Sequence, residues 1–151
     1  MDQKNFSKPL SLAKVQVTDA FWKKEMELVR TEVIPYQWNA LNDNVPEAAP
    51  SFCMRNYRRA GEVEKERKAK GDKFVQIKYP LDTFETLPKD GKMDGRFYGF
   101  LFQDTDFTKW VEAVAYSLTQ HPDPELEKRQ MKQLKLSAQH REKTDTSIPT
   151  I

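Results

Sequence analysis

Cysteine and histidine are scarce in this sequence, which has one cysteine, Cys53, and two histidines, His121 and His140. A single cysteine permits no internal disulfide and suggests a cytoplasmic protein. The two histidines stand far apart in the sequence, and no second cysteine accompanies them. We therefore expect no zinc site and no other metal site formed by this chain alone.

Long apolar runs are also missing. No stretch of eighteen apolar residues occurs, so we expect no membrane span and no membrane partner. The first residues, MDQKNFSKPLSLAKV, lack the apolar core and the cleavage site of a secretory signal peptide, which again suggests the cytoplasm. An excess of one charge is missing too, because 25 basic residues face 23 acidic ones. A net charge of +2 without a basic, aromatic-rich patch does not indicate a nucleic-acid partner.

What is present is a pattern of helices in a chain of 151 residues. Ala13, Val15 and Val17 alternate with polar residues and predict a short strand over 12–17. Asp19 then predicts the N-cap of a helix that starts near Phe21. The apolar residues of that helix recur at helical spacing, and Pro35 is expected to break or restart it; they are Trp22, Met26, Val29 and Val33.

The middle of the chain is predicted less sharply. Ser51–Ala60 is expected to form a short helix that ends at Gly61. Residues 62–73 are almost all charged, which is typical of a solvated helix face or a loop. Residues 74–79 alternate as in a short strand, and the prolines and glycines up to Gly95 predict a loop or insertion.

The clearest helix follows Asp104, Thr105 and Asp106, whose side-chain oxygens are suited to capping it. Its apolar stripe has regular helical spacing and predicts a buried face made of Phe107, Trp110, Val111, Val114 and Leu118. The same side chains are therefore expected to form core rather than a sugar-stacking platform. A surface ion pair is expected between Lys109 and Glu112, and a further helix starts at Glu125. Cys53, with no histidine near it in sequence, is interpreted as a small buried apolar residue.

Three stretches resemble one known family. They are VQVTDAFWKKEMELVRTEVIPYQWNALND, PSFCMRNYRRAGE and GRFYGFLFQDTDFTKWVEAVAYSLTQHPDPELEK. In this order they resemble the N-terminal part of the beta-L-arabinofuranosidases of glycoside hydrolase family 127. The resemblance covers most of residues 12–128, apart from a charged insertion, placed at 62–95.

The resemblance implies a mainly α-helical chain. Residues 1–128 would form the N-terminal part of an (α/α)6 barrel, incomplete here and preceded by the short β-strand. The intact enzymes hydrolyse terminal arabinofuranosides with retention, using a cysteine nucleophile near zinc and a glutamate acid/base. Those motifs lie downstream of the matching region, so the resemblance assigns no catalytic residue and no cofactor to this chain, and Cys53 is not the nucleophile. It does imply a carbohydrate partner for the intact enzyme. Polar groups beside aromatic residues suit a sugar, so Gln103, Asp104 and Asp106 are candidate substrate-binding residues, although helix capping explains the two aspartates equally well.

The last 23 residues, RQMKQLKLSAQHREKTDTSIPTI, depart from the family pattern. Codons can be chosen that encode these residues and that, when read one base earlier, encode KADEAIEIISAAQRENGYLNTYY. That alternative restores the family pattern and has regular apolar spacing. We therefore interpret 129–151 as a frameshifted tail and the chain as a truncated fragment. The tail carries five basic and two acidic residues, so the body has 20 basic and 21 acidic residues and is slightly acidic.

Two functional hypotheses follow. In the first, the chain is a fragment of a glycoside hydrolase and is inactive by itself, because an incomplete barrel leaves its inner apolar faces exposed. In the second, it is a small helical protein-interaction module without catalysis.

Overall fold

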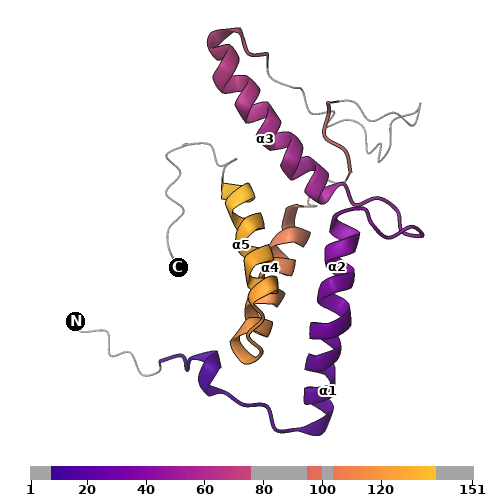
Figure 1. Ribbon diagram of the computed structural model, residues 1–151, viewed down its shortest axis with the longest axis vertical. Coiled ribbons are helices and arrows are strands. Elements are labelled where there is room, and N and C mark those ends of the chain that lie inside the picture. Colours follow the sequence, from indigo (N-terminus) through magenta and orange to yellow (C-terminus); the bar gives the residue numbers. More distant parts are fainter. Residues whose placement is uncertain (1–7, 76–94, 100–103, 139–151) are drawn as a thin grey trace, which may run out of the picture.

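A computed structural model describes residues 8–75, 95–99 and 104–138, and within these ranges the regular structure is entirely helical (Figure 1). A continuous helical column, α1 to α2, lies beside the paired helices α4 and α5, and α3 projects away from them. The elements are η1 (Leu12–Lys14), α1 (Ala20–Leu28), the π-helical turn η2 (Val29–Val33), α2 (Ile34–Leu41), α3 (Cys53–Lys70), η3 (Gly71–Lys73), α4 (Asp104–Gln120) and α5 (Pro124–Ala138).

The strand predicted over 12–17 is wrong. Leu12–Lys14 forms a single 3-10 turn, in which the N–H of Val15 donates to the Leu12 carbonyl at 3.0 Å. The side-chain amide of Gln120, at the end of α4, donates to the carbonyls of Leu12 and Val15 at 2.8 and 3.0 Å. A lone strand leaves its backbone groups unpaired, and the described residues contain no strand to pair with it. The local turn and Gln120 satisfy those groups instead.

The helical column begins and continues for local reasons. The Asp19 carboxylate accepts from the N–H of Trp22 at 3.0 Å, which confirms the predicted N-cap. A break or a restart of the helix was predicted at Pro35, and the structure shows the restart, because α2 begins at Ile34 without a gap in the helical column. The turn before it widens, so that the N–H of Ile34 donates to Val29 five residues back. Pro35 then occupies the first turn of α2, where the N–H that proline lacks is least needed for intrahelical hydrogen bonding.

Helix α3 is longer than predicted. It passes through Gly61 and ends at Gly71, whose φ of +53° suits glycine. Ion pairs three and four residues apart line its second half, with Glu64 paired to both Arg67 and Lys68. Such pairs stabilise an exposed helix modestly. The charged run is therefore a solvated helix as far as Lys70, and residues 76–94, where a strand and loop were expected, lie outside the described residues.

The core is small and centres on α4. The predicted stripe is confirmed, because Phe107, Trp110 and Val114 are all buried. The ring centroids of Trp110 and Trp38 of α2 are 4.7 Å apart, and those of Phe107 and Tyr57 of α3 are 5.0 Å apart. Helix α4 therefore joins α2 and α3 into one apolar cluster, which also contains Ile34, Leu41, Cys53 and Met54.

Candidate functional site

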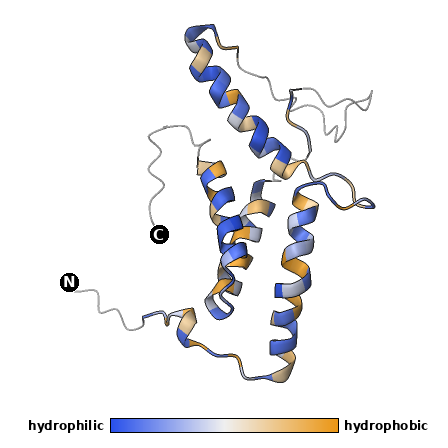
Figure 2. Ribbon diagram, in the orientation of Figure 1, coloured by the Kyte–Doolittle hydropathy of each residue, from blue (hydrophilic) through white to orange (hydrophobic). Residues whose placement is uncertain are grey.

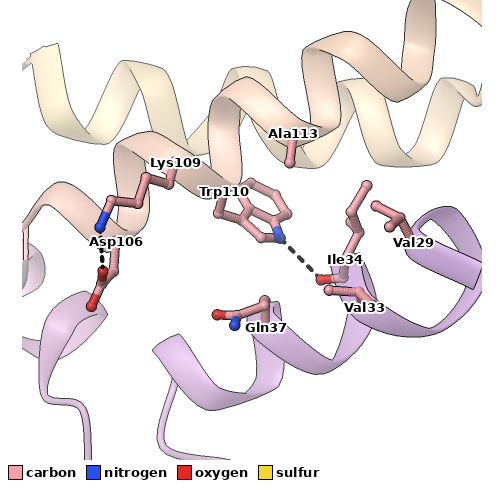
Figure 3. A pocket seen from close by; sticks show the side chains of 8 residues that line it. All are labelled: Val29, Val33, Ile34, Gln37, Asp106, Lys109, Trp110 and Ala113. Carbon is pink, nitrogen blue, oxygen red and sulfur yellow. Dashed lines mark hydrogen bonds and ion pairs between the residues drawn. The ribbon is translucent and has the colours of Figure 1, made fainter. Parts of the chain in front are cut away.

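A groove runs between the helical column and α4 (Figure 3). Its volume is about 240 Å³. Val29, Val33 and Ile34 form one wall, and Trp110 and Ala113 extend from α4 toward them. Three polar residues complete the lining, namely Gln37, Asp106 and Lys109. The groove is therefore largely apolar, with its polar groups on both of its walls.

Of the three substrate-binding residues predicted from the sequence, one lines this groove. Asp106 lies in the first turn of α4, where its charge favours the helix N-terminus, and its carboxylate contacts the Lys109 ammonium at 3.3 Å. Asp104 lies in the same first turn, is exposed and does not line the groove. Gln103 lies outside the described residues. Lys109 thus pairs with Asp106, whereas the predicted partner, Glu112, accepts a hydrogen bond from the Tyr116 hydroxyl.

Trp110 forms part of the core as well as one wall of the groove. Its side chain is buried, and its indole N–H donates to the Ile34 carbonyl at 3.0 Å. The indole donor is therefore already used within the protein, and one ring partner, Trp38, is in place. This agrees with the expectation that the aromatic residues of α4 form core.

The groove lining contains few side chains that could act in catalysis. Glycoside hydrolysis by carboxylates needs two of them, one as acid and one as base or nucleophile. Among the residues that line the groove, Asp106 is the one carboxylate, and it is held by Lys109. The groove is therefore suited to packing against an apolar surface and does not contain an acid/base pair.

Cys53 is buried at the start of α3. Burial removes water from the thiol and raises its pKa to about 12, an effect that the nearby Asp106, Asp104 and Asp43 charges reinforce. The thiol is therefore protonated at neutral pH and is a poor nucleophile and a poor metal ligand. In the described part of the chain, no three His, Cys, Asp or Glu residues are grouped so as to hold a metal ion. These residues do not fit the zinc that the family resemblance implies.

Helix α3 carries a polar anchor that was not predicted from the sequence. The Asn56 side chain donates to the Tyr98 carbonyl at 2.7 Å and accepts from the Tyr98 N–H at 3.3 Å. Arg55 and Arg59 donate to the carbonyls of Arg96 and Gly95. The only available signal was the run Arg55-Asn56-Tyr57-Arg58-Arg59, which places several hydrogen-bond donors on one helix. This anchor fixes residues 95–98, which precede α4, onto α3.

No helix within residues 8–75, 95–99 and 104–138 has the length and apolar character needed to cross a membrane.

Comparisons with known proteins identify the family. Residues 14–143 match the family described as the beta-L-arabinofuranosidase GH127 catalytic domain. A non-reducing end beta-L-arabinofuranosidase from Bifidobacterium longum subsp. longum is 33% identical over 112 residues, which are 74% of this chain and 14% of that enzyme. The crystal structure of a GH127 beta-L-arabinofuranosidase from Geobacillus stearothermophilus T6 is 39% identical, with a TM-score of 0.62. That match covers 85% of this chain and 16% of the Geobacillus chain, so this chain spans about one seventh to one sixth of the length of these relatives. The chain belongs to the GH127 beta-L-arabinofuranosidase family.

Proposed function

We propose that this chain supplies the N-terminal helices of a GH127 catalytic domain and that it is inactive by itself. The observation that carries the proposal is the match of residues 14–143 to the catalytic domain, although the chain spans only 14% of the Bifidobacterium enzyme. In the intact enzyme these helices would belong to an (α/α)6 barrel that hydrolyses terminal beta-L-arabinofuranosides with retention. The nucleophile, the acid/base and the zinc ligands would come from the remaining part of the domain.

The groove lining supports inactivity of the chain alone. Asp106 has no second carboxylate beside it in the groove lining, and the Cys53 thiol is buried and protonated at neutral pH. The described residues therefore offer a scaffold and a few polar groups. Of the two candidate residues that the structure describes, Asp104 and Asp106, Asp106 lines the groove.

The experiment is a chimera in which residues 14–128 replace the matching region of the Geobacillus enzyme. We expect the chimera to hydrolyse an aryl beta-L-arabinofuranoside, and the 151-residue chain alone to give no activity above a heat-treated control. A folded but inactive chimera would contradict the proposal, and so would hydrolysis by the chain alone. If the chain alone is a monomer with a cooperative thermal transition and the chimera is inactive, the small helical interaction module is the better description.

We also propose that residues 129–151 are encoded in a shifted frame, even though the family match extends into them as far as residue 143. Helix α5 includes Arg129–Ala138, and its inward positions are known from burial: Gln130 is buried, and Gln133, Leu134, Leu136 and Ser137 are half-buried. Three of these five inward residues are polar. The alternative reading changes the same positions by Gln130→Ala, Gln133→Ala, Leu134→Ile, Leu136→Ile and Ser137→Ile, so all five become apolar.

The outward positions of α5 change in the opposite sense. Met131, which is 47% exposed, and the exposed Lys132 and Lys135 would change by Met131→Asp, Lys132→Glu and Lys135→Glu. The alternative reading thus matches burial on both faces of the helix, as expected for a helix packed on one side. Sequencing the encoding DNA tests the proposal. Codons that do not yield KADEAIEIISAAQRENGYLNTYY in the neighbouring frame would contradict it.

A further inference from the structure

Four large apolar residues follow one another along the helical column without being covered. They are Trp22 and Met26 of α1 and Val29 and Val33 of η2, and their exposed fractions are 60, 37, 40 and 41%. We call these four residues the apolar seam. Helix α1 contains no buried residue, whereas α2, which continues it, buries Ile34 and Leu41. The column is therefore packed at its second half and uncovered along the seam.

The pattern of the seam is that of a buried face. Successive members lie four, three and four residues apart, which is the spacing by which one helix packs against another. Charged residues occupy several other positions of the same helix, including Lys23, Lys24 and Glu27, while Phe21 and Leu28 are exposed apolar residues outside the seam. A stripe of this kind in water costs free energy, because the burial of large apolar side chains is favourable. The seam is therefore built to be covered.

The groove extends the seam toward the core. Val29 and Val33 belong to both, and across the groove they face Trp110 and Ala113 of α4 (Figure 3). Figure 2 shows apolar segments distributed along the α1–α2 column, including its uncovered part. A helix placed on the seam would thus contact α1, η2 and α4 together. A sugar fits this surface less well, because most of the groove lining offers it no hydrogen bond.

The length of the relatives indicates what covers the seam. This chain corresponds to 16% of the Geobacillus chain, so most of that protein lies outside the matched region. The matched region has the same fold in both, with a TM-score of 0.62. Most of the family sequence therefore lies outside the matched region, and it is available to pack on the apolar seam.

We propose that the apolar seam is the docking surface for an apolar helix from the remainder of a GH127 catalytic domain. The inference rests on the proposed function, since it takes the covering helix from the same domain. The helix would place its own apolar stripe over Met26, Val29 and Val33 and extend into the groove beside Trp110. We therefore expect the remainder of the domain, expressed as a separate chain, to bind this chain only when the seam is intact.

The test is co-expression of the full 151-residue chain with the Geobacillus enzyme that lacks the matched region and carries an affinity tag. We expect the chain to co-purify with the tagged remainder in near-equal amounts. The double substitution Val29→Asp and Val33→Asp should lower recovery by at least about tenfold, as a charge in an apolar contact costs more than a factor of ten in binding. Leu28→Asp is the matched control. Leu28 is 47% exposed and lies on α1, about a third of a turn from Val29, so its substitution should leave recovery unchanged.

Further measurements separate the alternatives. Met26→Asp is a second seam variant, and Met26 lies outside the groove lining. It should also reduce recovery, so it tests the seam even if the Val29/Val33 variant does not fold. Equal recovery of the seam variants and the parent chain would overturn the inference, as would the absence of any recovery of the parent chain. A dimer of the chain alone that dissociates on Met26→Asp, seen by light scattering, would identify a second copy as the occupant and overturn it too. If the chimera is active and the seam variants co-purify as well as the parent chain, this inference alone is overturned. A folded but inactive chimera contradicts the proposed function.

Discussion

The indole N–H of Trp110 donates a 3.0 Å hydrogen bond to the carbonyl oxygen of Ile34, across 76 residues of sequence. Both residues are buried, and the bond joins α4 to the first residue of α2. It lies beside the contact between the Trp110 and Trp38 rings. Together with that ring contact, the bond ties α4 to the helical column beside the groove.

Replacing Trp110 tests that role. Trp110→Phe removes the buried donor and part of the ring, so we expect the free energy of unfolding to fall by about 1–3 kcal/mol. Urea denaturation followed by circular dichroism measures it. The control is Tyr116→Phe on the same helix, which removes an exposed hydroxyl bond to Glu112 and should cost less than about 0.5 kcal/mol. Similar losses for the two variants would contradict the assignment of Trp110 as the connection between α4 and α2.

The polar anchor on α3 makes a second prediction. Asn56→Ala removes both hydrogen bonds to the Tyr98 backbone, which is partly buried, and should destabilise the chain by about 1–3 kcal/mol. It should also speed hydrogen exchange of the Tyr98 amide, measured by mass spectrometry of a peptide that covers 95–99. Arg58→Ala is the control, since Arg58 is exposed and donates to the Asn42 side chain at 3.3 Å. Unchanged exchange at Tyr98 in the Asn56 variant would show that the anchor does not hold this segment.

Alkaline pH should destabilise the chain through two buried groups. Burial raises the pKa of Cys53 from 9.0 to about 12 and that of Tyr57 from 10.0 to about 12. The unfolded chain loses these protons first, so it binds fewer protons than the folded chain as the pH rises. The stabilisation is therefore complete below about pH 9 and is lost between about pH 9 and 12.

The measurement is the urea midpoint as a function of pH, from pH 7 to 11. The double variant Cys53→Ala and Tyr57→Phe should start lower, because it leaves small gaps in the core, and should decline less steeply above pH 9. Alkylation of Cys53 at neutral pH should require unfolding and should be fast only in denaturant. Rapid alkylation of the folded chain would show that the thiol is accessible.

Periodicity predicted the helices well, but it did not show which of them are covered. The stripes Phe107–Leu118 and Trp22–Val33 have the same kind of spacing, and the residues of the first are largely buried while those of the second are exposed. An apolar stripe shows that a helix face is suited to burial. It does not show which element covers that face, because the covering element comes from a distant part of the sequence. The strand predicted at 12–17 failed for a similar reason, because alternation alone supplies no pairing partner. The Asn56 anchor was not predictable, since it depends on where residues 95–98 return to α3.

The two faces of α5 allow the shifted frame to be tested in the protein as well as in the DNA. Ser137 is half-buried, and Ser137→Ile places apolar atoms against the core side, so we expect the free energy of unfolding to rise by about 1–2 kcal/mol. The control is Lys135→Ile, which adds the same side chain on the exposed face of the same helix and should change stability by less than about 0.5 kcal/mol. Urea denaturation of both variants distinguishes the faces. If Lys135→Ile stabilises the chain as much as Ser137→Ile does, the inward face of α5 does not favour the apolar residues of the alternative reading, and the structural support for the shifted frame is lost.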